Sequence, residues 1–227
     1  MNQDDKWLQS AFSATLIGGV ILFCIPPSAF IPNENLKLLL SLFTFPIFFL
    51  TVIFVTCWKH YRNDTWKKLE LKHLTKDDIG PILSAIPVFL LFAGMTALLH
   101  KFGVKPPPQH LVAFAADCPV WIFILILFSA GVVAPVIEEL TFRCVAGGFF
   151  KNVFPEEKWA YYLIPSLLFA LCHGIVWQSF QLFFFALYLQ WHFSKSSATR
   201  VILMHSLFNW CSLSLLILSR IGILRVP

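Results

Sequence analysis

Three groups of polar side chains interrupt the otherwise apolar C-terminal half of the sequence, and their types suit the activation of water. They are Glu138 and Glu139 with Arg143, Phe169 with His173, and His205 with Asn209. A carboxylate can take a proton from a water molecule that a neutral imidazole orients. A second imidazole and an amide can donate hydrogen bonds to the oxyanion that forms on a peptide carbonyl. The residue types therefore predict a hydrolytic site.

Helix geometry gives the two adjacent glutamates different surroundings. Glu139 lies four residues before Arg143, so on an α-helix the two side chains face each other and can neutralise their charges. Glu138 is rotated by about 100° from Glu139 and has no such local partner. Its partner must come from another helix, which predicts a site between helices.

Depth along the helices suggests which groups meet. Glu138 and His173 each lie about 20 Å along a helix from the turn that joins their two helices, so they can be level with each other. His205 lies about 15 Å from the start of its helix if that helix begins at Lys195, a looser match. His205 and Asn209 are four residues apart and form one polar stripe.

Each of these residues also has a simpler interpretation as part of the structure. The pair of Glu139 and Arg143 can be a structural ion pair, and His173 can bond a backbone carbonyl. His205 and Asn209 can join helices by hydrogen bonds, and Phe169 is expected to pack. The three groups together are harder to explain in this way than any one of them.

Composition identifies the class of protein that must position these residues. The chain has 227 residues, of which 58% are apolar and 13% are charged, and its mean hydropathy is +0.74. A soluble domain of this length could not bury so much apolar surface. We expect an all-α, polytopic transmembrane helix bundle with a catalytic cavity between its helices. The net charge of +5 is assigned to membrane topology and lipid headgroups, not to nucleic acid.

Apolar runs predict about seven to eight spans in a single membrane domain covering residues 1–227. The seven runs cover residues 8–25, 36–58, 81–99, 118–150, 159–173, 175–193 and 201–219. The fourth is too long for one straight crossing, and Pro135 removes a backbone donor inside it and is expected to kink the helix. Residues 101–117, which contain three consecutive prolines, are predicted to form a loop.

The distribution of Lys and Arg orients the bundle. Most of these residues fall in the N-terminus, the segment 59–78, the turn 143–158 and the loop 194–200, which share one side when seven spans are threaded. Basic residues accumulate on the cytoplasmic side of membrane proteins. We therefore expect an integral membrane protein whose N-terminus is cytoplasmic.

The ordered motifs EExxxR, FxxxH and HxxxN resemble those of the CAAX prenyl endopeptidase and bacteriocin-processing family, also called the Abi family. The resemblance covers residues 118–215, whereas residues 1–117 carry no motif. It implies an intramembrane glutamate protease in which Glu138 is the general base and His173 helps to activate water. His205 and Asn209 would then stabilise the oxyanion, with Glu139, Arg143 and Phe169 in support.

Three alternatives remain beside this interpretation. No cofactor is expected, but Glu138, His173 and His205 would make a zinc triad with one open position, although no HExxH motif supports it. A cysteine protease that uses Cys172 or Cys144 is disfavoured, and Cys172 is adjacent to His173 on a helix and so points elsewhere. A non-proteolytic membrane scaffold or bacteriocin-immunity protein of the same family would keep the polar residues only for packing.

The expected partner is a membrane-associated peptide or protein substrate in a lipid bilayer. Prenylated CAAX tails are the eukaryotic substrates of this family. The short chain carries no evident organelle signal, so we expect a prokaryotic plasma membrane, where peptide pheromones, bacteriocin precursors or membrane proteins are the expected substrates. Nucleic acid is not an expected partner.

Overall fold

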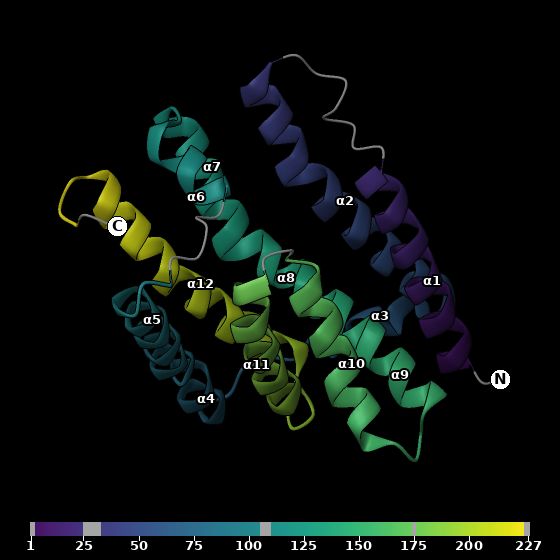
Figure 1. The fold of residues 1–227 in the computed structure, drawn as a ribbon. Helices are drawn as coiled ribbons and strands as arrows, with labels where there is room; N and C mark the ends of the chain where they lie inside the picture. The colour runs from purple at the N-terminus through teal and green to yellow at the C-terminus, as the bar shows by residue number, and fades with distance from the viewer. Residues whose placement is uncertain (1–2, 25–32, 105–109, 174–175, 225–227) are drawn as a thin grey trace.

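The computed structural model describes residues 3–24, 33–104, 110–173 and 176–224, and all the regular elements within them are helices (Figure 1). The α-helices are α1 (Gln3–Cys24), α2 (Glu34–Tyr61), α3 (Thr65–Lys68), α4 (Ile79–Leu83), α5 (Ala85–Lys101), α6 (His110–Asp117), α7 (Val120–Phe128), α8 (Ala134–Glu139), α9 (Gly148–Val153), α10 (Lys158–Leu171), α11 (Val176–Phe193) and α12 (Ala198–Arg220). Two short 3₁₀ helices, η2 (Arg62–Asp64) and η3 (Lys76–Asp78), and two π-helical segments, η4 (Ser129–Val133) and η5 (Leu140–Gly147), complete the set. The predicted all-α class is confirmed.

Four stretches of the described chain are long and apolar enough to cross a membrane. They are Phe43–Lys68, Lys76–Lys101, Val120–Val153 and Ala198–Arg220. The other three predicted spans correspond to α1, α10 and α11, which do not meet the same criterion. The 14 residues of α10 reach only about 21 Å, short of a hydrocarbon core of about 30 Å. The predicted count of seven to eight spans is therefore not confirmed.

The fourth predicted span is one continuous helix, which we call the long helix, made of α7, η4, α8, η5 and α9. It runs over Val120–Val153. Pro135 stands at the start of α8, directly after the π-helical segment η4. Its missing N–H is accommodated by this local change in helical bonding.

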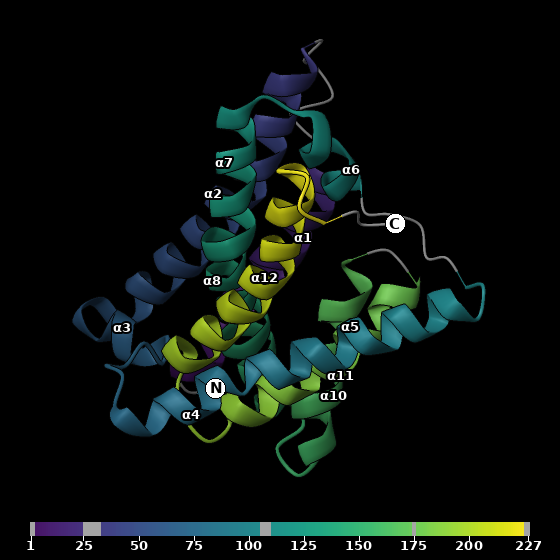
Figure 2. The same cartoon turned by 90° about the vertical axis from the view of Figure 1, so that its left-hand side faces the viewer.

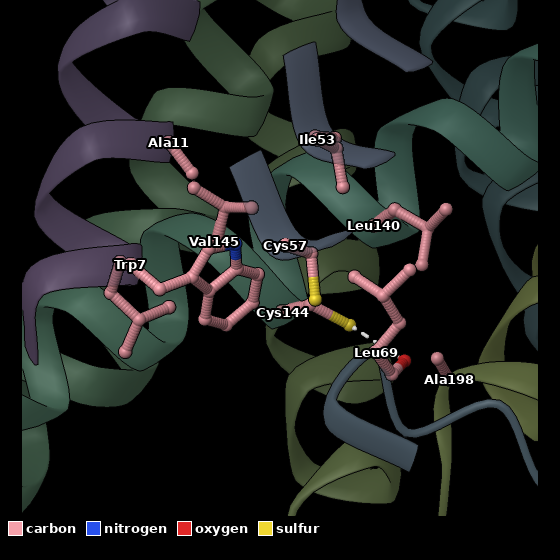
Figure 3. Packing of buried hydrophobic residues seen from close by; sticks show 10 residues of the cluster. Trp7, Ala11, Ile53, Cys57, Leu69, Leu140, Cys144, Val145 and Ala198 are labelled. Atoms are coloured by element: carbon pink, nitrogen blue, oxygen red, sulfur yellow. Dashed lines mark hydrogen bonds between the residues drawn. The ribbon is translucent and has the colours of Figure 1, made fainter. Parts of the chain in front are cut away.

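The segments predicted to share one side of the membrane lie together at one end of the bundle. One buried cluster joins residues from these segments (Figure 3). It includes Trp7 of α1, Cys57 of α2, Leu69 after α3, Val145 of the long helix and Ala198 at the start of α12. The Ala198 backbone N–H donates to the carbonyl oxygen of Glu70 over 2.9 Å. The buried Cys144 thiol in the same cluster lies 3.3 Å from the carbonyl oxygen of Leu69.

Helix α12 crosses the middle of the molecule and touches most of the other layers. It packs between α4 and α5 on one side and the long helix on the other (Figures 1 and 2). Helices α10 and α11 pair along their length and also contact η5 and α12, respectively. This arrangement brings the three polar motifs, which lie on the long helix, α10 and α12, to a common region.

The predicted loop 101–117 is wrong in its second half. Residues His110–Asp117 form α6, because an apolar helical run follows the three prolines instead of continuing the loop. Arg220 at the end of α12 donates from its guanidinium to the carbonyl oxygens of Ala115 and Cys118. These bonds satisfy backbone acceptors at the end of α6 and fix that end to α12.

Candidate active site

An ion pair on the long helix forms the buried base of the site. Arg143 Nε lies 2.7 Å from Glu139 Oε2, and Arg143 Nη2 lies 3.4 Å from Glu139 Oε1. Both side chains are fully buried. The Arg143 guanidinium also lies over the Phe169 ring, 5.2 Å from its centroid. The two charges therefore neutralise each other away from water, at the four-residue spacing seen in the sequence.

His205, on α12, takes its orientation from Glu139. Its Nδ1 lies 2.8 Å from Glu139 Oε1. An ionised carboxylate can only accept a hydrogen bond, so Nδ1 carries the hydrogen. The rings of Phe169 and Phe185 stand edge-on to the imidazole at centroid distances of 5.8 and 5.3 Å. Arg143, Glu139 and His205 thus form one hydrogen-bonded chain within an aromatic wall.

Glu138 stands beside this chain at its accessible edge. Glu138 Oε2 lies 3.7 Å from His205 Nε2, longer than a hydrogen bond. About a quarter of the Glu138 side chain is exposed (26%), against 4% for His205. Two carboxylates beside Arg143 leave one negative charge, which a protonated His205 would cancel. Glu138 is therefore the more accessible of the two carboxylates in this cluster.

Phe169 is the ring around which the three motifs meet. It is fully buried on α10, and its ring contacts both imidazoles, with a centroid distance of 4.8 Å to His173. His173 Nδ1 lies 2.8 Å from the backbone carbonyl oxygen of Phe169. A carbonyl oxygen can only accept, so Nδ1 donates and Nε2 is left as an acceptor. Phe169 packs as expected, and in doing so it links His173 to Arg143 and His205.

Asn209 lies one turn beyond His205 and contacts the backbone of the long helix. Its Nδ2 donates to the carbonyl oxygen of Ala130 over 2.8 Å. Ala130 belongs to the π-helical segment η4. One of the two amide hydrogens of Asn209 is therefore used to join α12 to the long helix.

Direct contacts connect Glu138, Glu139, Arg143, Phe169 and His205, and His173 joins them through Phe169. Although both residues are described, no hydrogen bond connects Glu138 to His173. The imidazole in contact with Glu138 is that of His205, because the crossing of α12 over the long helix decides which side chains face each other. Sequence reasoning missed Phe185, which carries no polar or spacing signal among the many Phe residues.

Part of the chain matches a known protein family. A family model described as type II CAAX prenyl endopeptidase Rce1-like matches residues 119–211. This region contains all three motifs and every residue of the site described above. Residues 119–211, which we call the endopeptidase region, are therefore similar to this family. Searches of the curated proteins and of the solved structures found no match.

The match to an endopeptidase family model fits a peptide hydrolase, and the apolar helices fit an integral membrane protein. The matched region begins one residue before α7 and ends within α12. It therefore comprises the long helix, the pair of α10 and α11, and the part of α12 that carries His205 and Asn209. The polar contacts described above for Glu138, Glu139, Arg143, His173, His205 and Asn209 all form within this region.

The described residues of the endopeptidase region do not fit the zinc triad. Within the described part of the chain, no three His, Cys, Asp or Glu side chains converge as metal ligands would. His205 Nδ1 is bonded to Glu139, and His173 Nδ1 is bonded to a backbone carbonyl. The reaction proposed for this site therefore uses no metal ion.

A surface recess of about 540 Å³ lies at the C-terminal end of α2, outside the endopeptidase match. It is lined by Phe54, Val55, Trp58, Arg62, Asn63, Thr65 and Trp66. None of these is a predicted site residue, so this recess is distinct from the predicted catalytic cavity. Its tryptophans and arginine are the side chains expected at a membrane–water interface.

Proposed function

We propose that this protein is an intramembrane endopeptidase that hydrolyses a peptide bond near the end of a membrane-associated protein or peptide. The observation that carries the proposal is the accessible Glu138 carboxylate beside the His205 imidazole, which Glu139 and Arg143 hold in place. A buried structural ion pair would not need a second, accessible carboxylate next to it. The family match supports the same reaction class.

In the proposed reaction Glu138 takes a proton from water as the water oxygen attacks the carbonyl carbon of the substrate. His173 Nε2 accepts a hydrogen bond from the second hydrogen of that water, because Nδ1 is already donating to the carbonyl oxygen of Phe169. The new carbon–oxygen bond makes a tetrahedral intermediate with a negatively charged oxygen. Glu138 then passes its proton to the leaving nitrogen as the carbon–nitrogen bond breaks.

His205 stabilises the negative oxygen of the intermediate. When it is protonated, its Nε2–H points to the side of Glu138, and its charge is balanced by the surplus carboxylate of the cluster. A fixed donor of this kind contributes most where water is excluded. Asn209 has one amide hydrogen left for the same oxygen after its bond to Ala130.

The proposed substrate is the terminal segment of a chain held at the bilayer, entering from the cytoplasmic side. The segments rich in Lys and Arg, including 59–78 and 143–158, lie at the end of the bundle that contains Leu69 and Ala198. Each basic residue near an anionic membrane surface contributes about 1 kcal/mol of attraction. A cavity open to that side gives the hydrolase its water.

The test is a comparison of membrane peptides from cells that carry the active enzyme and cells that carry Glu138→Gln. We expect new peptide termini only with the active enzyme. Glu156→Gln is the matched control, because Glu156 is exposed between α9 and α10, and it should give the wild-type peptides. Identical peptides with wild-type protein and Glu138→Gln would refute the protease and favour the scaffold function.

A further inference from the structure

The long helix contains two backbone carbonyls to which Pro135 cannot donate a hydrogen bond. In an α-helix the N–H of residue 135 would donate to the carbonyl of Gly131, and in a π-helix it would donate to that of Ala130. Pro135 has no N–H. The N–H of Ala134 is already engaged with the carbonyl of Ser129, five residues earlier. Ala130 therefore has no donor from residues 134 and 135.

Both carbonyls accept hydrogen bonds from α12 instead. Asn209 Nδ2 donates to Ala130 over 2.8 Å, and Ser206 Oγ donates to Gly131. Ser206 and Asn209 are three residues apart, so they lie on the same face of α12. Figure 2 shows this helix crossing the long helix at α8, and α12 also contacts η4. Each unpaired backbone acceptor would be costly in a membrane, where no water can replace the lost donor.

The π-helical segment determines the direction in which the catalytic residues point. A π-turn holds one residue more than an α-turn, and each residue of an α-helix adds about 100° of rotation. Returning η4 to α-helical bonding would therefore turn Glu138 by about 100° relative to α7. Glu138 follows η4 by only a few residues, in the short helix α8.

Resting on the proposed function, we infer that Ser206 and Asn209 are positioning residues. They hold η4 in its π-helical form by bonding the two carbonyls to which Pro135 cannot donate, and thereby aim Glu138 at the substrate. Ser206 thus acts on the reaction through the backbone carbonyl that it bonds. Asn209 has this role in addition to the donor role proposed above.

The hydrogen bonds are tested by thermal unfolding of the full-length protein in detergent, which needs no substrate. Ser206→Ala and Asn209→Ala should each lower the Tm by about 2–4 °C, the shift expected for one hydrogen bond in a protein of this size. In a Pro135→Ala background the same two substitutions should lower the Tm by less than half as much. With alanine at position 135 the helix can return to α-helical bonding. The N–H groups of residues 134 and 135 then donate to the carbonyls of Ala130 and Gly131. Equal losses in the two backgrounds would overturn the inference.

The effect on the reaction is tested with two substitutions of nearly equal shape, Ser206→Thr and Ser206→Val. The threonine keeps the hydroxyl donor, so its kcat should stay within about threefold of wild type. The valine lacks the donor and should lower kcat at least about tenfold per folded enzyme, with KM unchanged, because a misaimed base slows the chemical step. Wild-type kcat in Ser206→Val, with only the Tm lowered, would show a purely structural role. If the wild-type protein cleaves nothing, the proposed function fails, whereas the Tm comparison still decides the carbonyl bonding.

Discussion

His205 Nδ1 lies 2.8 Å from Glu139 Oε1, whereas its Nε2 lies 3.7 Å from Glu138 Oε2. The two adjacent glutamates therefore differ in exposure, and we propose that they also differ in function. Glu139 is buried and fixes the imidazole, and Glu138 remains at the accessible edge. One imidazole ring thus connects the buried ion pair to the more accessible carboxylate.

The two glutamates should respond oppositely to the same substitution. Glu139→Gln leaves Arg143 buried without its counter-charge, so it should lower the free energy of unfolding by about 3–5 kcal/mol. Glu138→Gln should keep a Tm close to wild type while abolishing cleavage. Thermal unfolding and a cleavage assay on both variants measure this difference. Equal Tm losses in the two variants would contradict the separation of roles.

The two histidines should differ in how much activity their loss removes. His173→Ala should abolish cleavage, because the attacking water loses its acceptor. His205→Ala should lower kcat by roughly 10²–10³-fold, the usual cost of one oxyanion donor. Steady-state kinetics on the folded variants gives both values. Near wild-type kcat in His173→Ala would exclude it from water activation.

A methyl group at Gly131 should disturb the contact between η4 and α12. A Cβ atom there would lie 2.6 Å from the Trp210 ring, so Gly131→Ala should cost about 1–3 kcal/mol of stability. Gly94→Ala in α5 is the matched control, because nothing lies within 4 Å of its Cβ position, and it should not lower the Tm. Adding Trp210→Ala to Gly131→Ala should recover part of the loss. No recovery would show that the strain arises elsewhere.

Chelation distinguishes the glutamate mechanism from the zinc alternative. We expect cleavage to be unchanged after prolonged treatment of the purified enzyme with a strong chelator, because the proposed base is a carboxylate and no step uses a metal. A zinc enzyme that keeps its fourth position open for water loses its nucleophile when the metal is removed. Activity that is lost on chelation and restored by added zinc would favour the metal reading.

The orientation of the bundle in the membrane can be tested by labelling single cysteines in a cysteine-free background. Lys72 and Lys151 lie in segments predicted to be cytoplasmic, and Lys101 ends α5 on the side predicted to be external. All three are exposed. A membrane-impermeant thiol reagent added outside intact cells should therefore label Lys101→Cys and spare Lys72→Cys and Lys151→Cys. The reverse pattern would invert the topology and the route by which the substrate enters.

The amino-acid sequence by itself determined the features that follow from composition and from spacing along one helix. The apolar content required membrane helices, and the four-residue spacing of Glu139 and Arg143 made their ion pair, because neighbouring turns of one helix hold fixed positions. The order of the three motifs was enough to indicate the endopeptidase family.

Only the tertiary structure decided which side chains of different helices meet. Depth along a helix suggested His173 as the neighbour of Glu138, but facing depends on how two helices cross, and the crossing of α12 put His205 there. The same crossing brought Ser206 and Asn209 to the carbonyls to which Pro135 cannot donate. The proline was visible in the sequence, but its hydrogen-bond substitutes come from a helix about 70 residues further along the chain, which local helix geometry cannot place.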